Sequence, residues 1–464
     1  MTRAALLLLL ISIAFSAKAQ NVLVVVLDDI GIEKIGAYGY AEALPTPNIT
    51  GLANSGVRFD RFWGFPACTQ FRVSLLTGEL PQDHGIGYGV VGIPGHERSF
   101  GLDPARMNIA HMASDAGYRT AFVGKWHAGS MDHLPAPEYH PLSSGFDTFR
   151  GGIAGSTVMS WLGTPGVTGH YAWERCEGGV ADLSCALETT YSAIKNTDDA
   201  IAEIQGSEPF LVIASYYLAH KPFDEPPDNL HSYDGQCLGT STPSICHLAA
   251  IEAVDSEVGR LLAAVDLADT TVFLAADNGT MEEAMTGPWP QDHVKGSLYE
   301  GGIHLPFIMA GEAVTHVGTV NALVQVTDFF ATIAEIIGST ETKPDSVSLV
   351  PYLSSGWTPI RQTLRSQAFK PPGTPGSGFW RAAAREDCWK LIRFEDTAPG
   401  LELYDLCNDP LETTVVDPLS LDIEDFASYN DLREAVWLPE PPQLLGMMAS
   451  LLFLHLLRGI RDRR

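Results

Sequence analysis

The sequence predicts an α/β fold in which helices sandwich a large, mostly parallel central sheet, followed by a small antiparallel sheet near the C-terminus. Two patterns lead to this fold class. Short apolar segments rich in β-branched residues are typical of buried parallel strands, and they occur at residues 21–27, 120–123, 210–216 and 271–276. Closer to the C-terminus, three strand-like segments follow one another with no helix between them, at residues 380–384, 389–394 and 401–406.

Segments with a helical pattern of apolar residues separate the buried strands. The expected helices cover residues 48–55, 109–116, 191–205, 248–265 and 328–337. This alternation favours a layered domain, because helices that connect parallel strands cover the faces of the sheet. We expect Asp328 to cap the last helix. Ser, Pro and Gly become frequent at residues 340–375, so we place the main domain at 20–355 and a C-terminal subdomain at 356–415.

The chain has 464 residues, of which 45% are hydrophobic, and a formal net charge of −27. This length and composition suffice for one large domain with a buried core and a smaller domain. The negative charge argues against nucleic-acid binding, which needs clustered Lys and Arg side chains for phosphate contacts. An anionic ligand would have to be attracted by a local group of cations, because the overall field repels it.

Residues 1–19 are typical of a secretory signal peptide. Arg3 supplies a weakly positive start, residues 4–15 are apolar, and residues 17–19 form a cleavage site of the small-residue type. A first buried strand and a membrane anchor are the alternatives, but the apolar segment is short for a membrane span. We therefore expect export through the Sec route.

The C-terminus carries a second targeting pattern at residues 438–464, behind an acidic segment at 416–437 that we interpret as a linker. The pattern consists of a Pro-Glu-Pro element, an apolar segment at 444–457 and a basic end. The apolar segment is shorter than the ~20 residues of a transmembrane helix. With its positive end, it would hold a translocating chain transiently at the membrane. The alternative is a helix packed on the protein body.

The order of these three elements resembles the PEP-CTERM sorting signal of Gram-negative bacteria. The resemblance implies recognition, and then removal, by an exosortase. Together with the signal peptide, it implies a location in the periplasm, at the cell surface or outside the cell.

Export implies an oxidising compartment, in which cysteines form disulfides. The chain has seven cysteines, and six of them lie in near-neighbour pairs. The expected pairs are Cys176 with Cys185, Cys237 with Cys246, and Cys388 with Cys407. Because a sequence alone does not determine connectivity, free buried thiols are the alternative. This pairing leaves Cys68 without a partner, which marks it for a special role.

Acidic and amide side chains follow two of the predicted parallel strands. Asp28 and Asp29 come directly after the first strand, and Asp277 and Asn278 after the fourth. In open α/β sheets, ligands bind at the carboxyl ends of the strands. These four side chains are hard oxygen donors, which suit Ca²⁺ or, as the weaker choice, Mg²⁺, and they lack the histidines of a zinc pair. Each pair taken alone is also explained by an ordinary turn.

Cationic and imidazole side chains follow the other two strands. Lys125 and His127 end the second strand, and His220 follows the third. Lys295 lies in a Gly-rich loop before an apolar segment. Each of these is individually more typical of a surface or satisfied core residue. Together they supply the local cations that the acidic chain otherwise lacks, so the sequence predicts an anion site at this sheet edge.

Cys68 stands at the start of a helical pattern that runs from about residue 70 to residue 76. A helix N-terminus favours a bound sulfate or phosphate, and it predicts a lowered pKa for the thiol. Arg72 lies one helical turn later, where it can bridge the nucleophile and the metal ligands. The alternative is a buried structural cysteine.

Residues 68–72 (CTQFR), with Leu-Thr-Gly at 76–78, resemble the nucleophile motif of the type I sulfatases, in the alkaline phosphatase superfamily. That motif reads Cys-x-Pro-Ser-Arg, and a formylglycine-generating enzyme oxidises its cysteine to formylglycine. Gln70 and Phe71 stand at the Pro and Ser positions. Further blocks that look like family motifs occur in the expected order, so that the resemblance covers about residues 21–415. They are residues 27–29, 45–48, 56–59, 124–127, 299–302 and 403–406.

The resemblance implies an exported sulfuric ester hydrolase, acting on an aryl sulfate or a sulfated polysaccharide. It assigns the metal, Ca²⁺, to Asp28, Asp29, Asp277 and Asn278. It assigns catalysis to Cys68, Arg72, Lys125, His127, His220 and Lys295. The implied mechanism uses the hydrated aldehyde of formylglycine, in which one hydroxyl attacks the sulfur and the other later expels sulfate.

Two other functions are compatible with the same residues. A phosphonate or phosphate ester hydrolase could use the same tetrahedral anion site. A catalytically impaired binding protein would keep the metal and anion sites but not the chemistry, and Gln70 and Phe71 favour it because they depart from the family motif.

Overall fold

The computed structural model describes residues 19–89, 101–129, 136–161, 163–354, 358–370, 379–395 and 400–436. The expected signal peptide therefore lies almost entirely outside the described residues, and the sorting segment at 438–464 lies wholly outside them. Within the described ranges, no helix has both the length and the apolar character needed to cross a bilayer.

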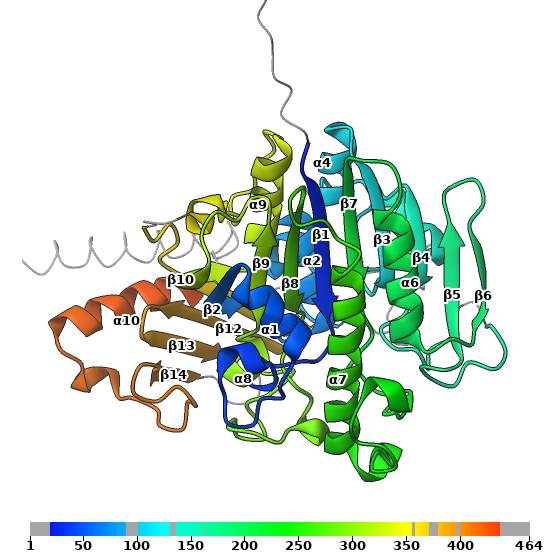
Figure 1. Cartoon of the computed structure of the whole chain (residues 1–464). Coiled ribbons are helices and arrows are strands. Elements are labelled where there is room, and N and C mark those ends of the chain that lie inside the picture. The colour runs from blue at the N-terminus through cyan, green and yellow to red at the C-terminus, as the bar shows by residue number, and fades with distance from the viewer. Residues whose placement is uncertain are drawn as a thin grey trace, which may run out of the picture.

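Ten strands of the described residues form one sheet (Figure 1). They are β1 (Asn21–Leu27), β2 (Val57–Trp63), β3 (Arg119–Lys125), β4 (Thr148–Gly152), β5 (Trp173–Gly178), β6 (Ser184–Glu188), β7 (Phe210–Ser215), β8 (Thr270–Ala276), β9 (Phe307–Gly311) and β10 (Gly318–Gln325). Their spatial order is β10-β2-β9-β8-β1-β7-β3-β4-β5-β6. The five central strands from β8 to β4 run parallel, and antiparallel pairs flank them. The predicted fold class is confirmed.

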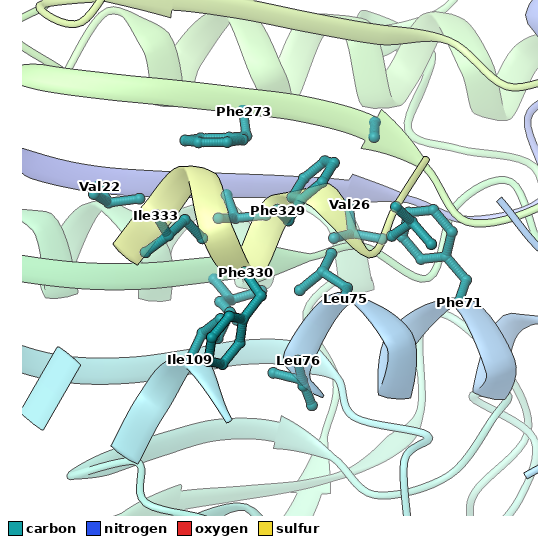
Figure 2. Close-up of a cluster of buried hydrophobic side chains, with 14 of the residues drawn as sticks. Val22, Val26, Phe71, Leu75, Leu76, Ile109, Phe273, Phe329, Phe330 and Ile333 are labelled. Carbon is teal, nitrogen blue, oxygen red and sulfur yellow. The ribbon is translucent and has the colours of Figure 1, made fainter. Parts of the chain in front are cut away.

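Helices cover both faces of this sheet. One face packs against α1 (Pro47–Asn54), α6 (Ser192–Ile204) and α7 (Pro243–Leu262), and the other against α2 (Cys68–Thr77), α4 (Ile109–Asp115) and α9 (Asp328–Ile337). The side chains of β1 alternate between the two cores, with Val22 and Val26 facing α2 and α9 (Figure 2) and Leu23 and Val25 facing α1 and α7. Three further helices are short: α3 (Pro81–His84), α5 (His140–Ser143) and α8 (Glu300–Ile303).

The four predicted parallel strands and five predicted helices all occur, most with ends shifted by a few residues. One detail differs. Thr327, not Asp328, is the N-cap of α9. The buried Asp328 carboxylate instead accepts hydrogen bonds from the backbone N–H groups of Gln325 (2.9 Å) and Val347 (3.0 Å) and pairs with Arg361.

A separate four-stranded antiparallel sheet follows, made of β11 (Leu364–Lys370), β12 (Phe379–Glu386), β13 (Trp389–Phe394) and β14 (Gly400–Asp405). The segment at 416–437, expected to be an irregular linker, instead contains α10 (Ile423–Val436). Leu432 and Val436, four residues apart, are buried with Trp380 of β12. Figure 1 shows this sheet and α10 at one side of the main sheet, opposite β6.

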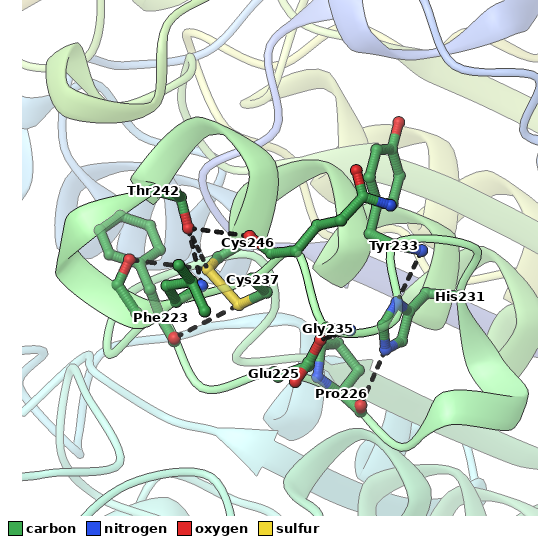
Figure 3. The surroundings of a disulfide bond; sticks show 12 residues. Phe223, Glu225, Pro226, His231, Tyr233, Gly235, Cys237, Thr242 and Cys246 are labelled. Atoms are coloured by element: carbon green, nitrogen blue, oxygen red, sulfur yellow. Dashed lines mark hydrogen bonds between the residues drawn. A yellow bond between two sulfur atoms is a disulfide. The ribbon is translucent and has the colours of Figure 1, made fainter.

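All three expected disulfides are present. Cys176 and Cys185 face each other across β5 and β6. Cys237–Cys246 closes the loop that leads into α7 (Figure 3). Among the described residues, this leaves Cys68 as a free and buried cysteine. The local pairing predicted from the sequence is confirmed.

A buried ion cluster fastens the small sheet to the main domain. Glu300, at the start of α8, pairs with Arg385 of β12 and with Lys390 of β13, both at 3.0 Å. Lys390 also pairs with Glu412 at 2.7 Å, and Glu412 accepts a hydrogen bond from the backbone N–H of Glu300. This cluster therefore fixes α8, and with it the loop that precedes α8, against the small sheet.

The ion cluster makes stability depend on pH. Burial raises the pKa of Glu412 to about 7, so the folded state holds this proton more tightly than the unfolded chain. Its contribution to stability is complete below about pH 4.5 and is lost as the pH rises through about 7. We expect Glu412→Gln to gain on the order of 1–3 kcal/mol in unfolding free energy relative to wild type across this window.

Urea denaturation at several pH values measures this difference. Glu341→Gln, which changes an exposed glutamate, serves as the matched control and should show a constant difference. A constant difference for Glu412→Gln would contradict the prediction.

Candidate active site

The carboxyl ends of β1 and β8 bring four oxygen-bearing side chains together. The two strands are adjacent and parallel, with Leu27 opposite Ala276, so the residues that follow them lie side by side. Those residues are Asp28, Asp29, Asp277 and Asn278, and all four are fully buried. The backbone N–H of Asp29 donates to Asp277 Oδ1 at 3.2 Å, and Asn278 Nδ2 donates to Asp29 Oδ1 at 2.6 Å.

This arrangement fits a hard metal ion. Ligand atoms of Asp28, Asp29, Asp277 and Cys68 all lie within 4.8 Å of one another. Within the described structure, three oxygens of the group are buried without a hydrogen-bond donor: Asp28 Oδ1, Asp29 Oδ2 and Asn278 Oδ1. Leaving a buried polar atom unpartnered costs about 1–3 kcal/mol. A divalent cation with oxygen ligands would satisfy all three atoms, and the donor set suits Ca²⁺ or Mg²⁺.

Three cations compensate the three buried carboxylates. Lys125 Nζ contacts Asp28 Oδ2, and Lys295 Nζ contacts Asp29 Oδ1. Arg72 Nη2 lies 2.9 Å from Asp277 Oδ2. The cations come from β3, from the loop before α8 and from α2. The protein groups are therefore balanced in formal charge, and a bound divalent cation would leave the site positive.

Arg72 also connects α2 to two strands. Its Nη1 donates to the backbone oxygen of Lys125 at 2.8 Å and to the hydroxyl of Ser215. Ser215 in turn donates to the same Lys125 oxygen at 2.8 Å. The guanidinium thus joins α2, the end of β3, the end of β7 and Asp277 at one point.

The three carboxylates differ in proton affinity. Burial raises the pKa of Asp277 to about 6, and the nearby Asp28 carboxylate adds to the rise. Burial likewise raises the pKa of Asp28, although Lys125 opposes it. Burial also acts on Asp29, but the attraction of Lys295, with His220 and Lys125, outweighs it and holds the pKa of Asp29 below its usual range. Asp29 is therefore the most firmly ionised of the three.

Cys68 is the first residue of α2 and is buried. The sequence predicted a lowered thiol pKa at this helix N-terminus, and that prediction is wrong. Burial raises the pKa of Cys68 to about 12, because the loss of hydration outweighs the attraction of Lys125 and Lys295. An unmodified thiol at this position is therefore protonated at neutral pH.

One histidine borders the carboxylate group, and a second contacts the residue that follows Cys68. His220 Nε2 lies 3.9 Å from Asp29 Oδ2, and its Nδ1 lies 2.6 Å from the backbone oxygen of Lys221, so Nδ1 carries the proton. Burial and the nearby Lys125 charge lower the pKa of His220 to about 3, which leaves a neutral ring. His127 Nε2 lies 3.4 Å from the hydroxyl of Thr69, the residue that follows Cys68.

The structure thus brings every predicted site residue to one sheet edge. His127 is connected to the others through its contact with Thr69, the neighbour of Cys68. It also adds residues that the sequence did not indicate. Ser215 ends β7, so its position at a strand end was the available signal. His247 lies inside α7 and donates from Nε2 to the backbone oxygen of Asp29 at 2.9 Å. No sequence pattern marks His247, because its contact spans 218 residues.

Gln70 and Phe71, which depart from the family motif, both point away from the site. Gln70 Nε2 donates to the backbone oxygens of Gly87 (2.8 Å) and Gln367 (2.6 Å). Phe71 is fully buried in the core with Phe62, and Figure 2 shows it projecting from α2 among apolar side chains. Neither departure removes a polar group from the site.

The buried pair of Arg72 and Asp277 should dominate local stability in metal-free buffer. Removing one partner of such a pair leaves an uncompensated charge, so Arg72→Ala should lower the unfolding free energy by about 3–5 kcal/mol. Combining Arg72→Ala with Asp277→Asn should recover part of this loss. Chemical denaturation of the single and double variants measures the coupling.

Lys221→Ala provides the control, because the exposed Lys221–Glu283 pair should contribute less than about 1 kcal/mol. Equal costs for Arg72→Ala and Lys221→Ala would refute the prediction.

Comparison with known proteins points to one family. A family model described as Sulfatase matches residues 20–339. The chain is 28% identical over 448 residues to arylsulfatase A from Homo sapiens, covering 85% of this chain and 83% of that protein. It is 24% identical over 396 residues to arylsulfatase J from Mus musculus, covering 80% of this chain and 64% of that protein. The match thus spans just under two thirds of arylsulfatase J.

A solved structure shows the same fold. The crystal structure of Ps i-CgsB in complex with k-i-k-neocarrahexaose superposes with a TM-score of 0.71, covering 90% of this chain and 92% of that chain at 22% identity. The family model covers more than half of the present sequence, and its matched region contains all ten site residues. This chain therefore belongs to the sulfatase family, and the expectation of a sulfuric ester hydrolase is confirmed at that level.

Proposed function

We propose that this sulfatase is an exported enzyme that hydrolyses the sulfate ester of an aryl alcohol or a saccharide, with a formylglycine made from Cys68 and a bound Ca²⁺. The observation that carries the proposal is the meeting of three buried carboxylates, three cations and residue 68 at one sheet edge. Such a site can hold a metal and a tetrahedral anion together, as sulfate ester hydrolysis requires.

The metal would be held by Asp28, Asp29, Asp277 and Asn278. The support is the set of unpartnered buried oxygens on three of these residues. When bound, a divalent cation supplies Lewis-acid stabilisation of negative charge on the sulfate. Ca²⁺ is proposed over Mg²⁺ because the cage is built almost wholly from protein oxygens, whereas Mg²⁺ usually keeps several waters.

Residue 68 stands where a nucleophile is needed. It opens α2 and faces the carboxylate cluster, and within the described residues it has no disulfide partner. A formylglycine here would supply a hydrated aldehyde in place of a protonated thiol. Gln70 and Phe71 are packed into the fold behind it, so the site retains the groups that the chemistry uses.

The remaining groups handle charge and protons. Lys125 and Lys295 lie on either side of the metal cage and would bind the non-bridging sulfate oxygens. Arg72 holds Asp277 and the end of β3 in place. Lys295 would protonate the leaving alcohol, or His220 would do so once its Nε2 has gained a proton. His127, next to Thr69, would take the proton that accompanies release of sulfate from residue 68.

Export and a saccharide substrate are supported by separate observations. The sequence carries the signal patterns at residues 1–19 and 438–464, and three disulfides suit an oxidising compartment. We therefore infer action in the periplasm, at the cell surface or outside the cell of a Gram-negative bacterium, after exosortase processing. The structural relative Ps i-CgsB was solved with an oligosaccharide, which supports a saccharide substrate here.

Metal binding should raise the thermal stability of the protein. This effect can be measured without an activity assay. At Ca²⁺ concentrations about a hundredfold above Kd, the unfolding free energy should increase by about 2.7 kcal/mol relative to protein in chelator. Asn278→Ala should abolish most of this increase. Asn321→Ala, which changes an exposed asparagine on β10, should retain it. If the melting temperature of the wild type does not change when Ca²⁺ is added, the proposed metal site loses its support.

The proposed reaction is tested by mass spectrometry together with hydrolysis assays. Protein from its native host should contain formylglycine at residue 68 and should hydrolyse 4-nitrophenyl sulfate faster than a phenylphosphonate ester. Cys68→Ala should lose at least about a thousandfold in kcat, because it removes the nucleophile. Faster turnover of the phosphonate would indicate the phosphonate hydrolase instead. Unmodified cysteine without hydrolysis would indicate the binding protein.

A further inference from the structure

A cluster of aromatic and cationic side chains lies outside the carboxylate site. It consists of Tyr88, Lys370 at the end of β11 and Phe379 at the start of β12, and we call it the Tyr88 cluster. Lys370 Nζ lies 3.9 Å from the centre of the Tyr88 ring and 5.9 Å from that of Phe379. The two rings meet edge to face at 6.3 Å. Lys370 is exposed to solvent, and both rings are partly exposed.

The Tyr88 cluster borders the active site. A Cβ atom placed on Gly296 would lie 3.3 Å from the Tyr88 hydroxyl, so this hydroxyl sits directly beside the residue that follows Lys295. Gly296 also donates its backbone N–H to Pro66 at 2.9 Å, two residues before Cys68. The phenol therefore adjoins the loop that delivers a cation to the metal cage.

Gln70 holds the Tyr88 segment and β11 in place against α2. Its amide donates to the backbone oxygen of Gly87, the neighbour of Tyr88, and to that of Gln367 in the strand that carries Lys370. Phe369 adds a backbone hydrogen bond to Gly87 at 2.8 Å. The nucleophile helix, the Tyr88 segment and β11 are thus held together by one buried side chain, two residues from Cys68.

The charge of Lys370 is available to a ligand. Among the described residues, Lys370 contacts the Tyr88 and Phe379 rings and pairs with no carboxylate, although the chain as a whole carries a net charge of −27. Contact with an aromatic face leaves the outward N–H groups of an ammonium free to bind an anion. The Tyr88 hydroxyl can donate one further hydrogen bond on the side of the loop that carries Lys295.

We propose that Tyr88 and Lys370 form a subsite for a second anionic group of the substrate, such as another sulfate or a carboxylate of a sulfated saccharide. This inference rests on the proposed sulfatase function and narrows its substrate class to polyanionic saccharides. The scissile sulfate occupies the carboxylate site, and the neighbouring anionic group contacts Lys370 and the Tyr88 hydroxyl. Phe379 supports the ammonium from the small sheet.

Binding to an inactive background tests the subsite. Isothermal titration of Cys68→Ala with a heparin hexasaccharide supplies the reference Kd. Adding Lys370→Gln should raise Kd about tenfold at about 0.1 M salt, with a smaller effect at high salt because the contact is exposed. Tyr88→Phe, which keeps the ring under Lys370 but removes the hydroxyl, should raise Kd by a smaller factor of about two to five.

Arg433→Gln is the matched control. Arg433 is also an exposed cation over a tyrosine ring, at 5.8 Å from Tyr429, and both lie on α10, which packs on the small sheet. Its loss should leave Kd within about twofold. An unchanged Kd in the Lys370→Gln variant, an equal rise in the Arg433→Gln variant, or no binding of the hexasaccharide by the reference protein would each overturn the subsite.

A second readout separates this inference from the proposed function. With Cys68 retained, Lys370→Gln should keep kcat/KM for 4-nitrophenyl sulfate within about twofold of wild type, because that substrate has no second anion. Failure of the wild type to hydrolyse 4-nitrophenyl sulfate would count against the proposed function alone. A large loss on 4-nitrophenyl sulfate in Lys370→Gln would assign Lys370 to the catalytic site and overturn the subsite.

Discussion

The structure depends on the compensation of three carboxylates buried at the ends of two adjacent strands. Asp28, Asp29 and Asp277 are held together by the parallel register of β1 and β8 and are removed from water. An uncompensated charge in such a position costs several kcal/mol, so each carboxylate needs a cation. The cations come from α2, β3 and the loop before α8. Balancing the carboxylates thus places three of the elements that carry the other candidate site residues, whereas His220 follows β7.

The small C-terminal sheet belongs to the same arrangement, because two buried contacts attach it near the site. Gln70 links α2 to β11, and Glu300 links the Lys295 loop to β12 and β13. Gln70 is therefore more than a departure from the family motif. Its amide donates to the backbone oxygen of Gly87 and to that of Gln367 in β11, and so ties both segments to α2.

The sequence was sufficient for features that depend on local pattern. Asp28 and Asp277 were recognisable because a carboxylate after a buried strand points to a ligand site, and all three disulfides join cysteines close in sequence. Features that depend on distant partners were not recognisable. His247 acts across 218 residues, and α10 is stabilised by Leu432 packing on another element rather than by its own composition. The pKa of Cys68 depends on burial, which the motif does not encode.

The net negative charge of the chain does not prevent an anionic substrate from binding, because charges in salt solution act only over short distances. At physiological ionic strength, fields decay over about 8 Å, so the net charge of −27 acts weakly beyond the surface that carries it. What an approaching sulfate meets is set by the nearest groups. The carboxylate site alone is balanced in formal charge and turns positive only with a divalent cation. Lys370 is exposed to solvent and, among the described residues, contacts aromatic rings and pairs with no carboxylate. In the proposed subsite, the small sheet would hold the second anion of the substrate, and the proposed metal site with its lysines would orient the scissile sulfate.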